Sequence, residues 1–342
     1  MFALTKIAAS TWGCSLARAR EVYTKVIRSA IAYGASAYHT PADPLQRTPR
    51  GVAKGLATVQ SSCLRVVAGA YRATPVRSLE TETWIPPLDL YLNKRLADFE
   101  ARLANTGKLE LLRNSRKAVA TAIRNRRVRG DTRLNASNQT PTEGTEARAA
   151  WAAEWLGTDT PEEALERDWR IRWQRAMDQA MADRPGRDIE PADHPDFTEE
   201  ALSKHIGLKK HESSMLVQAR TGKIGLRDFL HTRKVPGVTS PGCQCGAGRE
   251  TAIHILTECR DTEDQRTGLR AALGASAFTD RQGMGRATSS NDTGAIVARW
   301  LLGLGRLPEF RLAIRLAGDS SRTEDIEREA VKREGAAAGP TG

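Results

Sequence analysis

Three cysteines and one histidine within seventeen residues are the strongest candidate for a chemical site. The pattern is Cys-x-Cys-x8-His-x4-Cys, formed by Cys243, Cys245, His254 and Cys259. Three thiolates and one imidazole are a typical ligand set for tetrahedral structural zinc, with no position left for water or substrate. Glycines beside the first pair permit a tight turn. The pattern predicts a zinc knuckle that contributes folding free energy; the alternative is buried thiols beside a surface histidine.

The remaining candidate residues fit structural roles better than chemical ones. Cys14 and Cys63 lie on apolar helix faces and are expected in the core. A tryptophan row at residues 169–173 is also expected in the core rather than as a base-stacking platform. His205 and His211 lie in a lysine-rich stretch, where we expect them to face solvent or phosphate.

Catalytic motifs are absent from the sequence. It contains no GxxxxGK[ST] phosphate loop, no GxSxG elbow and no HExxH helix. It also lacks an aromatic-x-Asp-Asp turn, which would hold two metal ions for nucleotidyl transfer. We therefore expect that this chain by itself is not an enzyme.

Positive charge is concentrated in two stretches. The 342 residues carry a formal charge of +11, with a pI near 9.7. Eleven basic and two acidic residues lie between 1 and 77, and nine basic and two acidic between 108 and 133. Clustered cations favour a nucleic-acid partner, RNA or DNA, although a solvated basic face is the alternative. The candidate phosphate contacts are Arg18, Arg20, Lys25, Arg28, Lys54, Arg65, Arg116, Lys117, Arg124, Arg126, Arg127 and Arg129.

Composition limits the class of protein. With 40% apolar and 27% charged residues, the chain is typical of a soluble globular protein. No apolar run is long enough for a membrane span, and five cysteines are too few for a secreted disulfide scaffold. The first twenty residues loosely resemble a mitochondrial transit peptide, but their pattern continues into a helix and favours mature sequence. We expect a nuclear or cytoplasmic location.

Apolar residues recur at helical spacing through most of the chain, and no stretch alternates at period two. The sequence therefore predicts a mainly α fold. The expected parts are an N-terminal helical bundle (1–104), a basic arm and linker (105–147), a helical region ending in the zinc knuckle (148–262), C-terminal helices with a flexible stretch at 274–294 (263–317) and a disordered tail (318–342).

Four segments carry a family resemblance. Two N-terminal segments resemble the region after the polymerase palm in LINE-type non-LTR retrotransposon reverse transcriptases of filamentous fungi. They are residues 12–41, WGCSLARAREVYTKVIRSAIAYGASAYHTP, and residues 56–103. Residues 208–238 and SPGCQCGAGRETAIHILTEC (240–259) are similar to the C-terminal part of the same polyproteins. The resemblance implies a thumb-like bundle that grips a template–primer duplex, and a CCHC knuckle that handles element RNA or target DNA.

The resemblance does not extend to the catalytic parts of that family. The palm and its catalytic aspartates would precede Met1, and residues 105–197 lack the strands and spaced carboxylates of a ribonuclease H domain. The expected function is that of a non-catalytic, nucleic-acid-binding C-terminal segment of such a polymerase. Two alternatives stay open: a helical module that docks onto a separately encoded polymerase, and a decayed fragment without activity.

Overall fold

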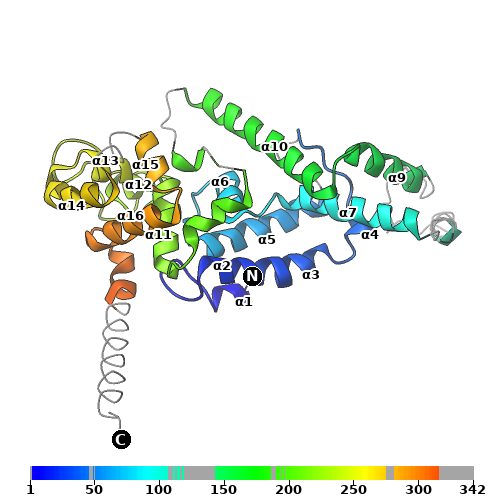
Figure 1. The fold of residues 1–342 in the computed structure, drawn as a ribbon, viewed down its shortest axis with the longest axis horizontal. Helices are drawn as coiled ribbons and strands as arrows, with labels where there is room; N and C mark the ends of the chain where they lie inside the picture. The colour runs from blue at the N-terminus through cyan, green and yellow to red at the C-terminus, as the bar shows by residue number, and fades with distance from the viewer. Residues whose placement is uncertain are drawn as a thin grey trace, which may run out of the picture. The chain divides into compact units, whose positions relative to one another are not determined.

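The computed structural model describes residues 2–45, 49, 51–106, 111, 114, 115, 118, 143–185, 190–193, 195, 197–274 and 281–315. This part of the chain is built from helices joined by turns (Figure 1). Within it there is no strand, and the β-bridges are isolated pairs: Ala8 with Gly13 and Gly242 with Arg249. The predicted mainly α fold is confirmed.

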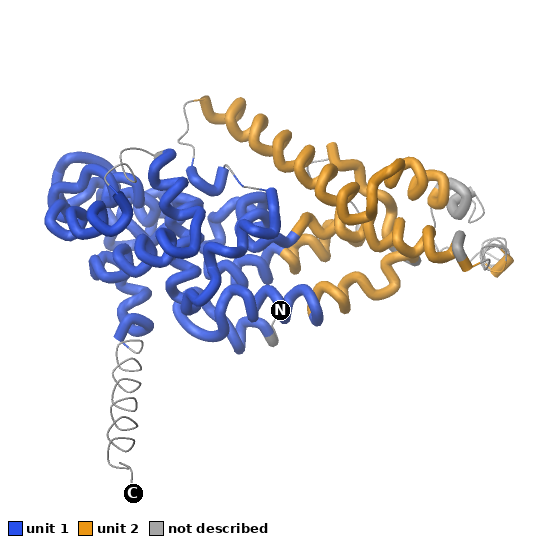
Figure 2. Tube along the Cα trace, viewed as in Figure 1, with its two compact units in different colours: residues 1–26, 61–85, 186–342 blue, residues 27–60, 86–185 orange. Residues whose placement is uncertain are grey.

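The helices form two compact units, coloured separately in Figure 2. Unit 1 contains residues 1–26, 61–85 and 186–342, and unit 2 contains residues 27–60 and 86–185. The structure therefore differs from the predicted single bundle over residues 1–104, because that stretch contributes to both units.

Unit 2 is organised around α7 (Leu88–Asn105), against which α9 (Glu143–Leu156) and α10 (Pro161–Asp183) pack (Figure 1). Thr160 begins α10 with a reciprocal capping box to Glu163. Trp169 and Trp173 are buried, which confirms their expected place in a core. The remaining helices of this unit are α3 (Arg28–Ala32), α4 (Ala35–Tyr38) and the first part of α5 (Gly51–Ala68).

Unit 1 has a larger apolar core, formed by residues of α11, α13, α14, α15 and α16 and of the turns beside them. Its elements are α1 (Phe2–Thr5), α2 (Leu16–Val22), most of the π-helical η1 (Tyr23–Ile27), the end of α5, α6 (Val76–Thr83), η2 (Pro191–Asp193), η3 (Glu199–His205), α11 (Lys210–Arg220), α12 (Arg227–Thr232), α13 (Ala252–Thr257), η4 (Arg260–Thr262), α14 (Glu263–Leu273), α15 (Arg281–Ala287), α16 (Asn291–Gly303) and η6 (Pro308–Phe310).

The buried helix α11 is tied to the C-terminal end of α5 by polar contacts. Lys210 donates from Nζ to the carbonyl oxygens of Val66 and Val67, at 2.8 and 2.6 Å. A cation is favourable there because the last carbonyls of a helix lack helical partners and carry its negative dipole end. Gln218 donates to the carbonyl oxygen of Gly69, at 2.9 Å. Segments 144 residues apart are thus joined in one unit.

A cluster of buried charges lies where α6, η3 and α11 meet. Glu82 accepts from Arg220 Nε at 2.8 Å and pairs with Lys204 Nζ at 3.4 Å, and all three side chains are almost fully buried. His205 lies among the same charges and is 3% exposed. The expectation that His205 faces solvent or phosphate is wrong, because the packing of η3 against its neighbours buries the ring. His211 is half-buried.

Burial of His205 predicts a pH-dependent stability. Burial, reinforced by the positive charges of Lys204, Arg220 and Lys210, lowers the pKa of His205 from 6.5 to about 3, although Glu82 opposes the shift. The unfolded chain then binds the proton more tightly, so stability is lost as pH falls from 6.5 towards 3. We expect a loss of about 2 kcal/mol between pH 7 and pH 5.

Urea unfolding at pH 7, 6 and 5 measures this loss. The matched variant is His205→Leu, which keeps an apolar group of similar size and removes the titrating ring. Between pH 7 and pH 5 the unfolding free energy of this variant should fall by about 2 kcal/mol less than that of the wild type. Equal pH dependence in both proteins would contradict the assignment to His205.

Two stretches expected to be irregular are partly helical. The predicted flexible stretch 274–294 contains α15 and the start of α16, because Met284 and Ala287 are buried in the unit 1 core and the side chain of Ser290 caps α16. The predicted linker 105–147 contains the start of α9, where glutamate, alanine and arginine have high helix propensity. The tail 318–342 lies outside the described residues.

Candidate metal centre

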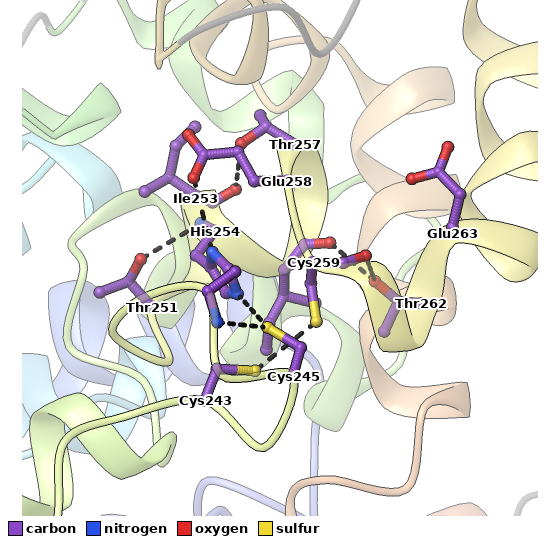
Figure 3. A network of polar contacts seen from close by, with 12 residues as sticks. Cys243, Cys245, Thr251, Ile253, His254, Thr257, Glu258, Cys259, Thr262 and Glu263 are labelled. Carbon is purple, nitrogen blue, oxygen red and sulfur yellow. Dashed lines mark hydrogen bonds and ion pairs between the residues drawn. The ribbon is translucent and has the colours of Figure 1, made fainter.

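The four predicted ligands come together in unit 1 (Figure 3). Cys243 and Cys245 lie in the loop between α12 and α13, His254 lies in α13, and Cys259 follows that helix. The Sγ atoms of Cys243 and Cys259 are 3.6 Å apart, and Sγ of Cys245 is 3.2 Å from Nε2 of His254. All four ligand atoms lie within 4.8 Å of one another.

This geometry fits a metal ion at the centre of the four atoms. A tetrahedral zinc ion with Zn–S distances of about 2.3 Å requires sulfurs about 3.8 Å apart. Cys243, His254 and Cys259 are buried, and Cys245 is half-buried. The four residues therefore lie close enough to hold a metal ion, with every tetrahedral position taken by a protein ligand.

A tight loop positions the first two cysteines. Cys243 donates its backbone N–H to the carbonyl oxygen of Gly248, at 2.7 Å, beside the bridge between Gly242 and Arg249. Gly246 donates back to the carbonyl oxygen of Cys243 and has a φ of +72°, a value that favours glycine. The glycines flanking this cysteine pair thus allow both sulfurs to face the same point (Figure 3).

The short helix α13 and the turn after it position the other two ligands. Thr251 caps α13 by accepting from the backbone N–H of His254, at 3.2 Å. Cys259 donates its N–H to the carbonyl oxygen of His254, at 2.8 Å. The buried guanidinium of Arg266 donates to the carbonyl oxygens of Ile255 and Cys259, at 3.1 and 2.9 Å. The carbonyls of His254 and Ile255 belong to the last turn of α13, where carbonyls lack helical partners, and the carbonyl of Cys259 lies in the turn after it.

The environment changes the acidity of two thiols in opposite directions. The backbone N–H of Ala247, 3.4 Å from Sγ of Cys245, and the nearby His254 lower the pKa of Cys245 to about 6. Burial raises the pKa of Cys243 to about 11. A thiolate is the form that binds metal, so Cys245 is more ready than Cys243 to begin coordination.

Groups outside the ligand set orient it. Nδ1 of His254 lies 3.5 Å from a carboxylate oxygen of Glu258, which leaves Nε2 directed at the sulfurs. A carboxylate on the second nitrogen is a common partner of a metal-bound histidine. The i,i+4 spacing of this pair is visible in the sequence.

Arg306 also contacts the site, from a segment that the sequence pattern does not connect with it. It donates to Sγ of Cys243 at 3.4 Å, and its second terminal nitrogen lies 3.9 Å from Sγ of Cys259. It also pairs with Glu250 at 2.7 Å and Asp261 at 3.3 Å. A separation of 47 to 63 residues from these cysteines gives no local signal.

The candidate phosphate contacts have different surroundings. Arg18 and Lys25 are exposed and both pair with Glu21. Arg20 instead donates to the carbonyl oxygens of Thr83 and Trp84, at 2.8 and 3.0 Å, and so joins α2 to the end of α6. That guanidinium is committed to holding unit 1 together, which disfavours it as a phosphate contact.

The other candidate phosphate contacts also differ in whether their side chains are exposed or bonded within the protein. Arg65 donates to the carbonyl oxygens of Ser61, Arg72 and Thr74. Arg28 lies over the ring of Tyr91, 4.2 Å from its centroid, and Lys54 is exposed. The remaining six candidates lie outside the described residues: Arg116, Lys117, Arg124, Arg126, Arg127 and Arg129.

Exposed cations that are absent from the predicted phosphate contacts flank the first cysteine pair in sequence. Arg233 and Lys234 follow α12 in the loop that leads to the cysteines, and Arg249 follows the first cysteine pair. The side chain of Arg249 is 63% exposed although it pairs with Asp228. Their clustering in sequence, with one acidic residue between 221 and 249, is the signal that could have identified them.

The two other cysteines lie apart from the metal centre's ligand set. Cys63 is fully buried in α5, and burial raises the pKa of its thiol. Cys14 is half-buried. The core position expected of Cys63 is confirmed, whereas Cys14 is only partly covered.

Comparison with protein-family models, with curated proteins and with solved structures finds no match for this chain. The resemblance to LINE-type reverse transcriptases therefore stays a prediction from the quoted segments. Among the helices that the structure describes, none is long and apolar enough to cross a membrane.

Proposed function

We propose that this chain is a nucleic-acid-binding module stabilised by structural zinc, and that it acts as the non-catalytic C-terminal part of a LINE-type reverse transcriptase. The observation that carries the proposal is that exposed Arg249 is paired with Gly242, next to Cys243, while exposed Arg233 and Lys234 precede the same loop in sequence; the loop supplies two of four residues that could hold a metal ion. A rigid metal loop that presents cations suits a polyanionic backbone. The net charge of +11 and the family resemblance support the same partner.

Zinc is the metal that the ligand set favours. Three thiolates and one imidazole combine soft and borderline ligands, which select zinc over magnesium or calcium. Because the protein supplies all four ligands, the ion has no open position for substrate or water, and its role is to hold the loop and α13 together. The expected contribution is to folding rather than to a reaction.

Phosphate contacts are expected to supply most of the affinity. Lysine and arginine on an exposed loop neutralise phosphates, which positions a protein on a duplex but carries little sequence information. Arg18 and Lys25 are exposed on the same unit and would add to its positive charge, although both pair with Glu21.

Binding should therefore weaken steeply with salt. Neutralisation of four or five phosphates gives a slope of about −4 for log affinity against log salt on duplex DNA. Fluorescence anisotropy measures this slope, with the zinc-loaded full chain and either a labelled duplex or a labelled single strand. The salt concentration is varied from about 50 to 300 mM, where the effect is large.

A pair of charge-matched variants locates the surface. The double variant Arg233→Gln with Lys234→Gln should make the salt dependence less steep, with a slope smaller in magnitude by about 2. It should also weaken binding about tenfold or more at low salt. The control, Arg311→Gln with Arg315→Gln, removes the same charge from exposed positions at the end of the described chain and should change binding much less. A flat salt response of the wild type, or equal effects of both double variants, would contradict the proposal.

A further inference from the structure

The guanidinium of Arg306 spans two of the three ligand sulfurs. Its Nη1 lies 3.4 Å from Sγ of Cys243, and its Nη2 lies 3.9 Å from Sγ of Cys259. Glu250 and Asp261 hold the same two nitrogens, at 2.7 and 3.3 Å. The two carboxylates fix the orientation of the planar guanidinium group, so that one arginine faces both sulfurs.

The backbone around Arg306 is anchored in the core that also contains α13. Leu307 and Phe310 are almost fully buried in the same cluster as Ile255 and Leu256 of α13. Gly305, with a φ of +67°, makes the turn between α16 and this segment. The position of Arg306 is therefore set by packing of the segment 304–310, which lies outside the loop that carries the ligands.

Charge explains what the arginine adds. Three thiolates and a divalent ion leave an excess of one negative charge on the cluster, and burial of such a charge is costly without a partner. The guanidinium supplies one positive charge and N–H groups directed at two of the sulfurs. An outer partner of this kind makes metal binding more favourable, and the bound metal in turn favours the contact between the guanidinium and the sulfurs.

We propose that Arg306 is a positioning residue of the metal centre, which balances its charge and couples metal binding to the docking of residues 304–310. The inference rests on the proposed zinc site but is independent of nucleic-acid binding. It assigns residues 304–310, which follow α16, to the metal-dependent part of the fold. Metal loss would then loosen two segments of the chain that lie far apart in sequence.

Competition for zinc with a chromogenic chelator tests the charge balance on the full chain. Arg306→Gln should lower zinc affinity between about tenfold and a hundredfold, as removal of outer-shell partners does. The zinc affinity of Arg306→Lys should lie between those of the wild type and Arg306→Gln, because one ammonium keeps the charge but cannot span two sulfurs. The control is Arg299→Gln in α16, an exposed arginine that pairs with Glu212 at 2.7 Å and should leave zinc affinity unchanged.

Hydrogen exchange tests the coupling, and its measurement on the wild type does not depend on the folding of a variant. Removal of zinc from the wild type should increase exchange in residues 304–310 as well as in residues 243–259. In Arg306→Gln the response of residues 304–310 to zinc should be smaller than in the wild type. A purely structural role for Arg306 would lower stability equally with and without zinc.

The outcomes separate the inference from the proposal on which it rests. A wild-type chain that takes up no zinc would overturn the metal centre and the inference together. If the wild type binds zinc and the zinc affinity of Arg306→Gln lies within about twofold of the wild-type affinity, the role of Arg306 alone would be overturned. Exchange in residues 304–310 that does not respond to zinc in the wild type would overturn the coupling.

Discussion

Cys259→Ser is expected to abolish stoichiometric zinc binding and to lower the free energy of unfolding of unit 1 by at least about 3 kcal/mol. Cys259 is fully buried and supplies one of four ligands, so a serine hydroxyl there would leave three ligands around a buried ion. Metal content by mass spectrometry and urea unfolding with and without added zinc measure both effects.

The matched control for this variant is Cys14→Ser. Cys14 is half-buried and lies outside the group of residues that could hold the metal. Its replacement should preserve one zinc per chain and should change stability much less. If Cys259→Ser kept a full complement of tightly bound zinc, the assigned ligand set would be wrong. Chelation of zinc from the wild type should reproduce the stability loss of Cys259→Ser.

Glu82→Gln should destabilise unit 1 by about 3 to 5 kcal/mol at pH 7, because it leaves buried cations without their anion. Glu82 is 1% exposed and faces Arg220 and Lys204, whose side chains are 2% and 3% exposed. Burial raises the pKa of Glu82, but the charges of Arg220 and Lys204 outweigh it and lower the pKa to about 2. The carboxylate is therefore ionised throughout the neutral range.

The control for Glu82→Gln is Glu199→Gln. Glu199 pairs with Arg20 at 3.5 Å but is 71% exposed, and exposed pairs contribute about 1 kcal/mol or less. Urea unfolding of both variants at pH 7 gives the comparison. A loss below about 1 kcal/mol for Glu82→Gln would show that the buried cations find other partners or water. Because ionised Glu82 stabilises above its unfolded pKa, the difference between wild type and variant should shrink below pH 4.5.

Local signals in the sequence predicted much of the helical structure. The capping box at the start of α10 is a signal of this kind, because its hydrogen bonds join Thr160 and Glu163, three residues apart. The tryptophans of the same helix lie on one apolar face and are buried. Helical hydrogen bonds connect residues four apart, so short windows of sequence contain most of the information that they need.

Expectations that depended on distant packing were less accurate. α15 forms in a stretch rich in glycine and serine, where the core contacts of Met284 and Ala287 supply stability that local propensity does not. His205 was expected at the surface because its neighbours are charged, yet those charges are paired inside unit 1. A charged residue in the sequence does not reveal whether an opposite charge far along the chain will meet it.

The sequence by itself determined the candidate metal ligands, because all four fall within seventeen residues and short-range turns bring them together. It also determined the mainly α fold, through periodicity and caps. Only the tertiary structure decided that Arg306 meets two of the sulfurs, that Glu82 meets Arg220, and that residues 1–104 belong to two units. The physical reason is that burial of apolar surface selects contacts without regard to sequence separation, and polar partners are then chosen from the groups that burial brings together.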